Sequence, residues 1–459
     1  MPQKNTFACL AMLLAFGGSS AVAQEPEESA REAAEAEFRS ADERVAPQQG
    51  AGGIAFERIL TSPENVPLNL AYARERIAAG DLKEGAAAIE RILLIRPELH
   101  DVRVLYGLVL YRMGMYDRAR FELEKALESS ELAETVRAEA EVYLTRIKRE
   151  QRATRGSLTI TAGMEYDQNR NQAPSSGQLL FLNIPIDAEG RNGDAAYIVS
   201  AAGRIVHDLG SQNGHTLHGE AAYFRSDKVE VDNLDLDAGN VAIGGTWNFG
   251  RFSITPRARA ALIYLDGEDY LRTLGGELEI LMRVRPDLRT YLVFRGDDED
   301  FRATPDFLSS PLRSGARLSL RPGVQWFYSP TTSLRVEGLA MDKNAVADFE
   351  TLRRYGAFAQ HSWLLGRGAF SLISGWAERS DYEGPDAFVS PTITREEWLY
   401  RGRVAFGAPI SFFLKGAPKG VSDINIIAQY EYETVDSNLL NFDYDTHKVS
   451  LVFTKRFSF

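Results

Sequence analysis

Cysteine is almost missing from this sequence, and so are long apolar runs beyond its first residues. The one cysteine among 459 residues is Cys9, inside an N-terminal apolar segment. If that segment is removed during export, the mature chain can form neither disulfide bonds nor thiolate metal sites. No later stretch reaches the roughly 18 consecutive apolar residues typical of a membrane-spanning helix, which excludes a helical membrane protein.

Enzyme motifs and a basic charge excess are also missing. The sequence contains neither Gly-x-Ser-x-Gly nor His-Glu-x-x-His, and its six histidines are scattered. His215 and His218 lie three apart in an expected strand, so they face opposite sides and cannot share a metal. The net charge of -12 argues against nucleic acid as a partner. We therefore expect that the protein is not an enzyme and that it binds no cofactor or metal. A barrel enzyme whose site is built from scattered loop residues is the alternative.

The first residues have the pattern of a secretory signal peptide. Lys4 precedes an apolar run from Phe7 to Phe16, and small residues at Ala21 and Ala23 suit signal peptidase. We expect cleavage after Ala23. The alternative, a membrane anchor, needs about 20 apolar residues, and this run is too short.

Residues 24–54, rich in Glu, Ala, Gln and Pro, are expected to form a disordered acidic leader. Residues 55–150 instead show helical periodicity and an internal repeat of 34 residues, the period of tetratricopeptide helix pairs. A further helix over 132–147 is expected to cap the stack, since each repeat needs a neighbour. An ordinary helical hairpin is the alternative. The repeated positions are Ala73, Gly80, Ile89 and Ile92, matched by Gly107, Gly114, Leu123 and Ala126.

From residue 156 to 459 alternation replaces the helical period. Apolar Ile426, Ala428, Tyr430 and Tyr432 alternate with polar neighbours such as Glu431. This pattern suits an antiparallel transmembrane β-barrel with lipid outside and a wet lumen, in an α + β multidomain protein. A soluble sandwich or propeller is the alternative. Strands are expected to begin near fourteen positions: Ser157, Asp194, His215, Leu234, Phe252, Tyr270, Arg289, Pro311, Ser333, Asp348, Ala369, Arg395, Val421 and Tyr444.

The links between these strands alternate in length. Short turns such as 249–251 and 366–368 alternate with longer links such as 168–193 and 383–394, although 409–420 is a long link on the short side. Short periplasmic turns and long outer loops are typical of outer-membrane barrels. The acidic run 296–300 is expected at the base of an outer loop, where it is either solvated or a divalent-cation site near lipopolysaccharide.

Two sets of residues are candidate interaction sites. The last strand ends in Phe457 and Phe459 on one apolar face, a pattern typical of the signal read by the barrel assembly machinery. Helical repeats present a concave surface to polypeptides, and Tyr and Arg are common anchors there. For Tyr111, packing against the next helix is an equal alternative. The expected groove residues are Asp101, Val104, Leu108, Tyr111 and Arg112.

This arrangement resembles the surface lipoprotein assembly modulators, which join a signal peptide and helical repeats to a fourteen-stranded barrel. The resemblance rests on residues 91–127 and on the first strand, from Gly156-Ser157-Leu158 to Glu165-Tyr166-Asp167-Gln168-Asn169. It implies a translocon that receives client lipoproteins or secreted proteins in the periplasm and moves them to the cell surface. The energy would come from client folding or binding outside.

Two other functions remain open. Exopolysaccharide export porins also join repeats to a barrel, and lumen arginines such as Arg257, Arg259 and Arg283 would suit an acidic polymer. Glu277, Glu279 and Glu431 offset those arginines, which favours protein export. A general nutrient porin is the third possibility.

Overall fold

The computed structural model describes residues 59, 61–62, 64–418 and 420–459. These residues form two compact units, one helical and one a β-barrel, and each is described by itself. The expected signal peptide with its Ala21 and Ala23 cleavage site, and the expected leader at 24–54, lie outside the described residues.

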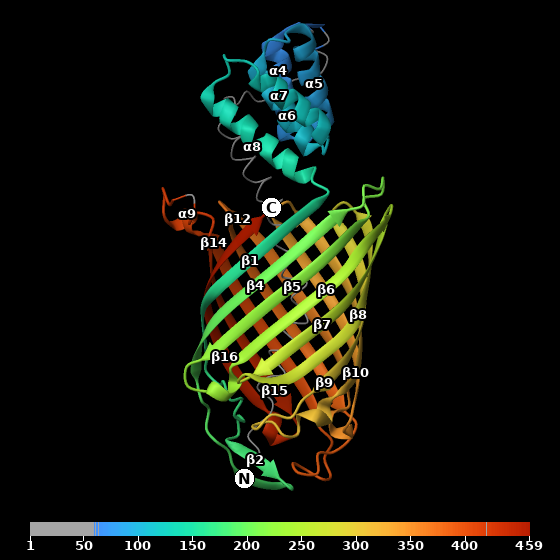
Figure 1. Ribbon diagram of the computed structural model, residues 1–459, viewed down its shortest axis with the longest axis vertical. Helices are drawn as coiled ribbons and strands as arrows, with labels where there is room; N and C mark the ends of the chain where they lie inside the picture. The colour runs from blue at the N-terminus through green and yellow to red at the C-terminus, as the bar shows by residue number, and fades with distance from the viewer. Residues whose placement is uncertain (1–58, 60, 63, 419) are drawn as a thin grey trace. The chain divides into compact units, whose positions relative to one another are not determined.

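The helical unit consists of two helix pairs followed by a longer helix (Figure 1). The first helices of the two pairs begin 34 residues apart, and so do the second helices. No described helix combines the length and the apolar character that crossing a membrane requires. The helices are α4 Val66–Ala78, α5 Leu82–Ile95, α6 His100–Arg112, α7 Tyr116–Leu127 and α8 Glu134–Glu150.

Small residues let the helices of each pair approach closely, as the repeat predicts. A Cβ on Gly85 would lie 3.2 Å from the carbonyl oxygen of Ala73, and one on Gly107 would lie 3.4 Å from that of Ala119. Positions 73 and 85 recur 34 residues later as 107 and 119, so each pair has one glycine and one alanine at the same contact. The two pairs are therefore built on one plan.

The barrel closes with fourteen antiparallel strands, so the predicted fold and strand number are confirmed. Each strand pairs with the next in the chain, and β1 pairs with β16 over eleven registered residues. The barrel strands are β1 Thr154–Asp167, β4 Asp194–Asp208, β5 Thr216–Lys228, β6 Leu236–Phe249, β7 Phe252–Leu265, β8 Glu268–Arg285, β9 Leu288–Phe301, β10 Gly315–Ser329, β11 Thr332–Ala345, β12 Leu352–Gly366, β13 Ala369–Tyr382, β14 Glu396–Pro409, β15 Asn425–Ser437 and β16 Tyr444–Ser458.

Three predicted strand starts, at Pro311, Asp348 and Val421, lie four residues too early. Short 3-10 helices at Ser310–Arg313 and Asp348–Glu350 occupy the first two positions. Such turns leave no period in the sequence, because they are shorter than either the helical or the strand repeat. At the third position, residues 421–424 still belong to a link that includes the short helix α9 Ile410–Phe413.

The first long link contains a hairpin that the alternation pattern did not reveal. Its strands are β2 Gln178–Phe181 and β3 Ile184–Asp187. The backbone N–H of Leu182 donates to the carbonyl of Phe388 at 2.9 Å, and that of Leu180 donates to Asn441 Oδ1 at 2.7 Å. The hairpin is thus held by two other loops at the same end of the barrel.

The two faces of the barrel wall differ in polarity as predicted. On β15, Tyr430 and Tyr432 are exposed outward, whereas Glu431 and Glu433 point inward and are buried. Large apolar side chains are exposed on the outer face of every barrel strand, among them Ile243, Leu274 and Leu318. The core of this unit is therefore polar, and its surface is apolar.

Candidate functional site

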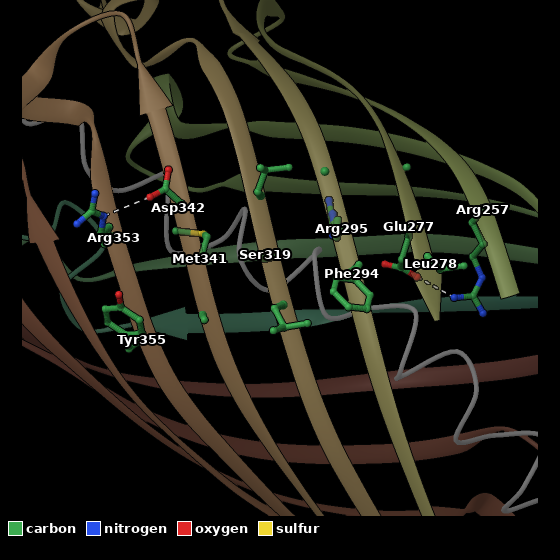
Figure 2. A pocket seen from close by; sticks show the side chains of 15 residues that line it. Arg257, Glu277, Leu278, Phe294, Arg295, Ser319, Met341, Asp342, Arg353 and Tyr355 are labelled. Atoms are coloured by element: carbon green, nitrogen blue, oxygen red, sulfur yellow. Dashed lines mark hydrogen bonds and ion pairs between the residues drawn. The ribbon is translucent and has the colours of Figure 1, made fainter. Parts of the chain in front are cut away.

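The inner wall of the barrel carries connected ion pairs, and the first group centres on Glu277 of β8. Arg257 and Arg259 of β7 donate to this carboxylate at 2.7 and 2.9 Å, and Arg321 of β10 lies 3.7 Å away. Figure 2 shows the pair of Arg257 and Glu277 beside Arg295, on neighbouring strands of the barrel. One carboxylate thus serves three arginines.

A second group joins β9, β10 and β11. Asp297 accepts from Arg295 at 2.6 Å and from Arg317 at 2.8 Å. Glu299 lies 2.9 Å from Arg317 and 3.0 Å from Lys343. The acidic run 296–300 therefore lies at the end of β9, directly before a long link, and Asp297 and Glu299 are held in ion pairs rather than solvated or grouped as a cation site. Alternation sends Asp297 and Glu299 into the lumen and Asp298 outward.

The third group lies on β13 to β15. Arg401 donates to Glu433 at 2.7 Å, and Arg403 donates to Glu431 at 2.8 Å. Both guanidinium groups also lie over the ring of Trp376, at 5.7 and 5.2 Å from its centroid. The ring restricts the arginine side chains, so these charges are fixed in place.

A glycine and a tyrosine make a close fit on β9 and β10. Gly323 pairs directly with Tyr291 on one side and with Glu337 on the other. The Tyr291 ring occupies the space that a side chain at Gly323 would need, and its hydroxyl donates to Glu337 at 2.5 Å. Any side chain at position 323 would therefore displace this tyrosine.

The segment Tyr166-Asp167-Gln168-Asn169, singled out in the sequence, closes the barrel at the loop end of β1. The buried Asn169 side chain donates to the carbonyls of Ala173 and Asp445 at 3.0 Å each. The Asp167 carboxylate accepts from the Asn169 backbone and from Thr446 of β16. The segment fastens the first long loop to the last strand, which is a structural role.

The offset of lumen arginines by glutamates, expected from the sequence, takes a specific form. Glu277 and Glu279 both pair with Arg257, at 2.7 and 3.4 Å. Glu431 pairs elsewhere on the wall, with Arg403. Arg283 lies directly opposite Arg289 in the register of β8 and β9, so two like charges are neighbours. Glutamates therefore neutralise some lumen arginines, such as Arg257 and Arg403, whereas Arg283 has another arginine as its direct neighbour.

The expected groove residues lie on α6, and they divide into two kinds. Val104 and Leu108 are buried core residues. The Tyr111 ring packs against Tyr116 of the next helix, α7, at 5.5 Å and against Tyr143 of α8 at 5.2 Å, which agrees with the packing alternative. Asp101 is exposed and Arg112 is half-buried, so these two side chains are the accessible part of the set.

The two terminal aromatic residues are exposed. Phe457 lies on the outer apolar face of β16, along with Val449, Leu451 and Phe453, and Phe459 follows the last residue of the strand. Lys455 interrupts this face and donates to the carbonyl of Gly420. Within the residues that the structure describes, no group of three or more metal-binding side chains comes together.

No protein-family model matches the chain, and no curated protein matches it. Among solved structures, OccAB1 from Acinetobacter baumannii shares 8% identity, with 66% of this chain and 96% of that chain covered and a TM-score of 0.36. OprD from Pseudomonas aeruginosa shares 9% identity, with 66% and 95% covered and a TM-score of 0.33. Structural similarity at this level does not indicate a function. The function is therefore inferred from the geometry of the barrel.

Proposed function

We propose that this protein is an outer-membrane channel whose lumen conducts hydrophilic solutes. The observation that carries the proposal is the reversed polarity of the barrel, with apolar residues outside and fixed ion pairs inside. An apolar outer face needs lipid, because contiguous exposed apolar area of this size is costly in water. A polar inner face suits water and dissolved cargo. Fourteen strands enclose more space than the eight that side chains alone can fill.

The chain order supports a periplasmic position for the helical unit. Only three residues separate the end of α8 from the start of β1, and β1 starts at the end of the barrel that carries the short turns. Short turns face the periplasm in outer-membrane barrels. We therefore place the N-terminal unit in the periplasm and the long loops, with the β2–β3 hairpin, at the cell surface.

Electrical recording on the full chain tests the channel. Purified protein added to a planar lipid bilayer should give discrete conductance steps. A matched control is protein unfolded by heating, identified by its shifted gel mobility, which should give none. Folded protein that inserts without conductance would overturn the proposal.

The terminal aromatic residues provide a separate test of membrane assembly. Replacing Phe457 and Phe459 by Ala should lower the folded form in outer-membrane fractions, if the barrel assembly machinery reads this strand. Phe453→Ala, on the same exposed face but away from the end, is the control. Equal amounts of folded protein in all three strains would remove this partner from the proposal.

A second candidate function is supported by the repeated helix pairs. A passive pore needs no 34-residue repeat unit, whereas such units commonly hold polypeptide. On this interpretation the helical unit, of tetratricopeptide type, receives a client lipoprotein or secreted protein and the barrel translocates it. Asp101 and Arg112 are the groove residues accessible to that client.

Deleting residues 56–149 separates the two functions. Under the second candidate, the barrel still inserts and conducts, while surface labelling of the client falls. The double variant Asp101→Ala and Arg112→Ala should give a milder loss, and Arg118→Ala, on another exposed part of the unit, should give none. Unchanged client display after the deletion would exclude the translocon. A fall in polysaccharide secretion alone would instead indicate polymer export.

A further inference from the structure

Basic residues exceed acidic ones on one part of the lumen wall, formed by β7 to β11. The side chains that share the face of Glu277 on these five strands include nine basic residues and five acidic ones. The basic residues are Arg257, Arg259, Arg283, Arg289, Arg295, Arg317, Arg321, Arg335 and Lys343. The acidic residues are Glu277, Glu279, Asp297, Glu299 and Glu337.

The rest of the wall shows no such excess. On β4 to β6, the inward face has two basic residues, Arg204 and Lys228, against Asp194, Asp208 and Glu220. On β12 to β16 and β1, six basic residues face six acidic ones. The basic residues there are Arg155, Arg354, Arg401, Arg403, Lys448 and Arg456. The acidic residues are Glu165, Asp167, Glu378, Glu397, Glu431 and Glu433.

The acidic side chains of β7 to β11 are too few to neutralise this excess by themselves. Glu277 already serves three arginines, and Asp297 serves two. At the short-turn end, Arg283 and Arg289 are direct cross-strand neighbours of the same charge. Like charges side by side destabilise a sheet, so this arrangement is costly for folding. An oxyanion near them would be attracted by both guanidinium groups, of which that of Arg289 also lies over the Phe327 ring.

We propose that the wall of β7 to β11 makes the channel selective for anionic solutes that carry a carboxylate or phosphate group. This inference rests on the proposed channel function. Rings of Arg and Lys side chains select anions in pores, because their field raises the local anion concentration and repels cations. The balanced wall opposite adds no competing field.

Ion selectivity is the direct test. The full chain is recorded in a planar bilayer under a potassium chloride gradient at low salt, where screening is weakest. The reversal potential should show preference for chloride over potassium. The triple variant Arg283→Gln, Arg289→Gln and Arg321→Gln should reduce the chloride-to-potassium permeability ratio by about threefold or more.

The control removes the same charge from the outer face. Arg225, Arg353 and Arg379 point outward near the long-loop ends of their strands, in exposed ion pairs. Replacing all three by Gln should leave the permeability ratio unchanged. If the lumen variant does not fold, Glu279→Gln gives the opposite test, because it removes a lumen carboxylate and should raise the ratio.

Larger anions identify the ligand chemistry. Inorganic pyrophosphate and citrate, added separately, should each block the current in the wild type and block it less in the lumen triple variant. A stronger effect of one anion would show whether phosphate or carboxylate is preferred. A channel that conducts with no anion preference, or that spermine blocks better than both anions, would overturn this inference and leave the proposed channel intact. Absence of any conductance would overturn both.

Discussion

The helical unit and the barrel have opposite distributions of polar and apolar residues. In the helical unit the interior is apolar, formed by side chains such as Ile89, Val109 and Leu123, and the most buried ion pair among its described residues joins Arg103 to Glu122. In the barrel the ion pairs fill the interior, and Leu318 or Ile373 are exposed outside. The hydrophobic effect drives the first arrangement in water, and the second follows if lipid replaces water around the barrel.

The difference also concerns how charges are stabilised. Arg103 donates to Glu122 at 2.7 Å and to the carbonyl of Pro97 at 2.8 Å, so a single pair is held by its own hydrogen bonds. In the barrel, Arg317 bridges Asp297 and Glu299, and Glu299 also holds Lys343. A connected network spreads the loss of one member over several partners, whereas an isolated buried pair does not.

The largest expected effect is therefore in the helical unit. Arg103→Ala should destabilise that unit by about 3–5 kcal/mol, because it leaves the Glu122 carboxylate buried without its cation. Urea-induced loss of the helical circular-dichroism signal in the full chain measures this. Arg96→Ala breaks an exposed pair with Glu98 and should cost no more than about 1 kcal/mol. Similar losses for both variants would contradict the contrast between the two regions.

Next in size is a test of what surrounds the barrel. Ile243, midway along β6, and Val346 in a loop are almost equally exposed, at 69% and 67%. If Ile243 faces lipid, Ile243→Arg should cost about 2–4 kcal/mol, as expected near the bilayer midplane. Val346→Arg should change stability by no more than about 0.5 kcal/mol, as surface changes do in water. The folded fraction on heat-modifiable gels gives both values, and equal values would mean that both residues face water.

A smaller effect is expected inside the barrel, where Tyr291 covers Gly323. Gly323→Ala should cost about 1–3 kcal/mol, because the new methyl group must push the ring and its hydroxyl away from Glu337. Gly402→Ala, at a strand glycine with open space around it, is the control and should be near neutral. The midpoint of thermal unfolding in detergent compares the two. A tolerated Gly323→Ala would show that the lumen network adjusts freely.

The sequence predicted the barrel well, because its alternation is a property of each strand alone. Eleven of the fourteen predicted strand starts lie within three residues of the observed ones, and the three wrong ones precede β10, β12 and β15. The β2–β3 hairpin was missed for a related reason. Its strands have four residues each, too few for a period, and their position depends on distant loops at Phe388 and Asn441.

The lumen charges were predictable as residues but not as a pattern. Alternation placed Arg257, Arg259 and Glu277 inside, whereas their sharing of one carboxylate depends on cross-strand register. Register likewise brings Arg283 beside Arg289, and the turn between them fixes it. On α6, the helical period could not separate core from groove, because Val104 and Leu108 are buried among other helices.

The smallest expected effect tests whether the two helix pairs of the repeat depend equally, in stability, on their equivalent glycines. Gly80 and Gly114 end α4 and α6 with φ of +88° and +73°. At each, two hydrogen bonds close the helix: Gly80 donates to Ile77 and Asp81 to Arg76, while Gly114 donates to Tyr111 and Met115 to Leu110. No atom lies within 4 Å of a Cβ added at either position, so substitution meets only backbone strain.

Gly80→Ala and Gly114→Ala should therefore each lower the stability of the helical unit by about 1–2 kcal/mol. Urea unfolding, followed by the helical circular-dichroism signal, measures both losses. Asn tolerates this conformation better and should cost less at both sites. Because the two glycines hold equivalent positions in the repeat, the two losses should be equal, and a clear inequality would mean that only one pair depends on this helix end.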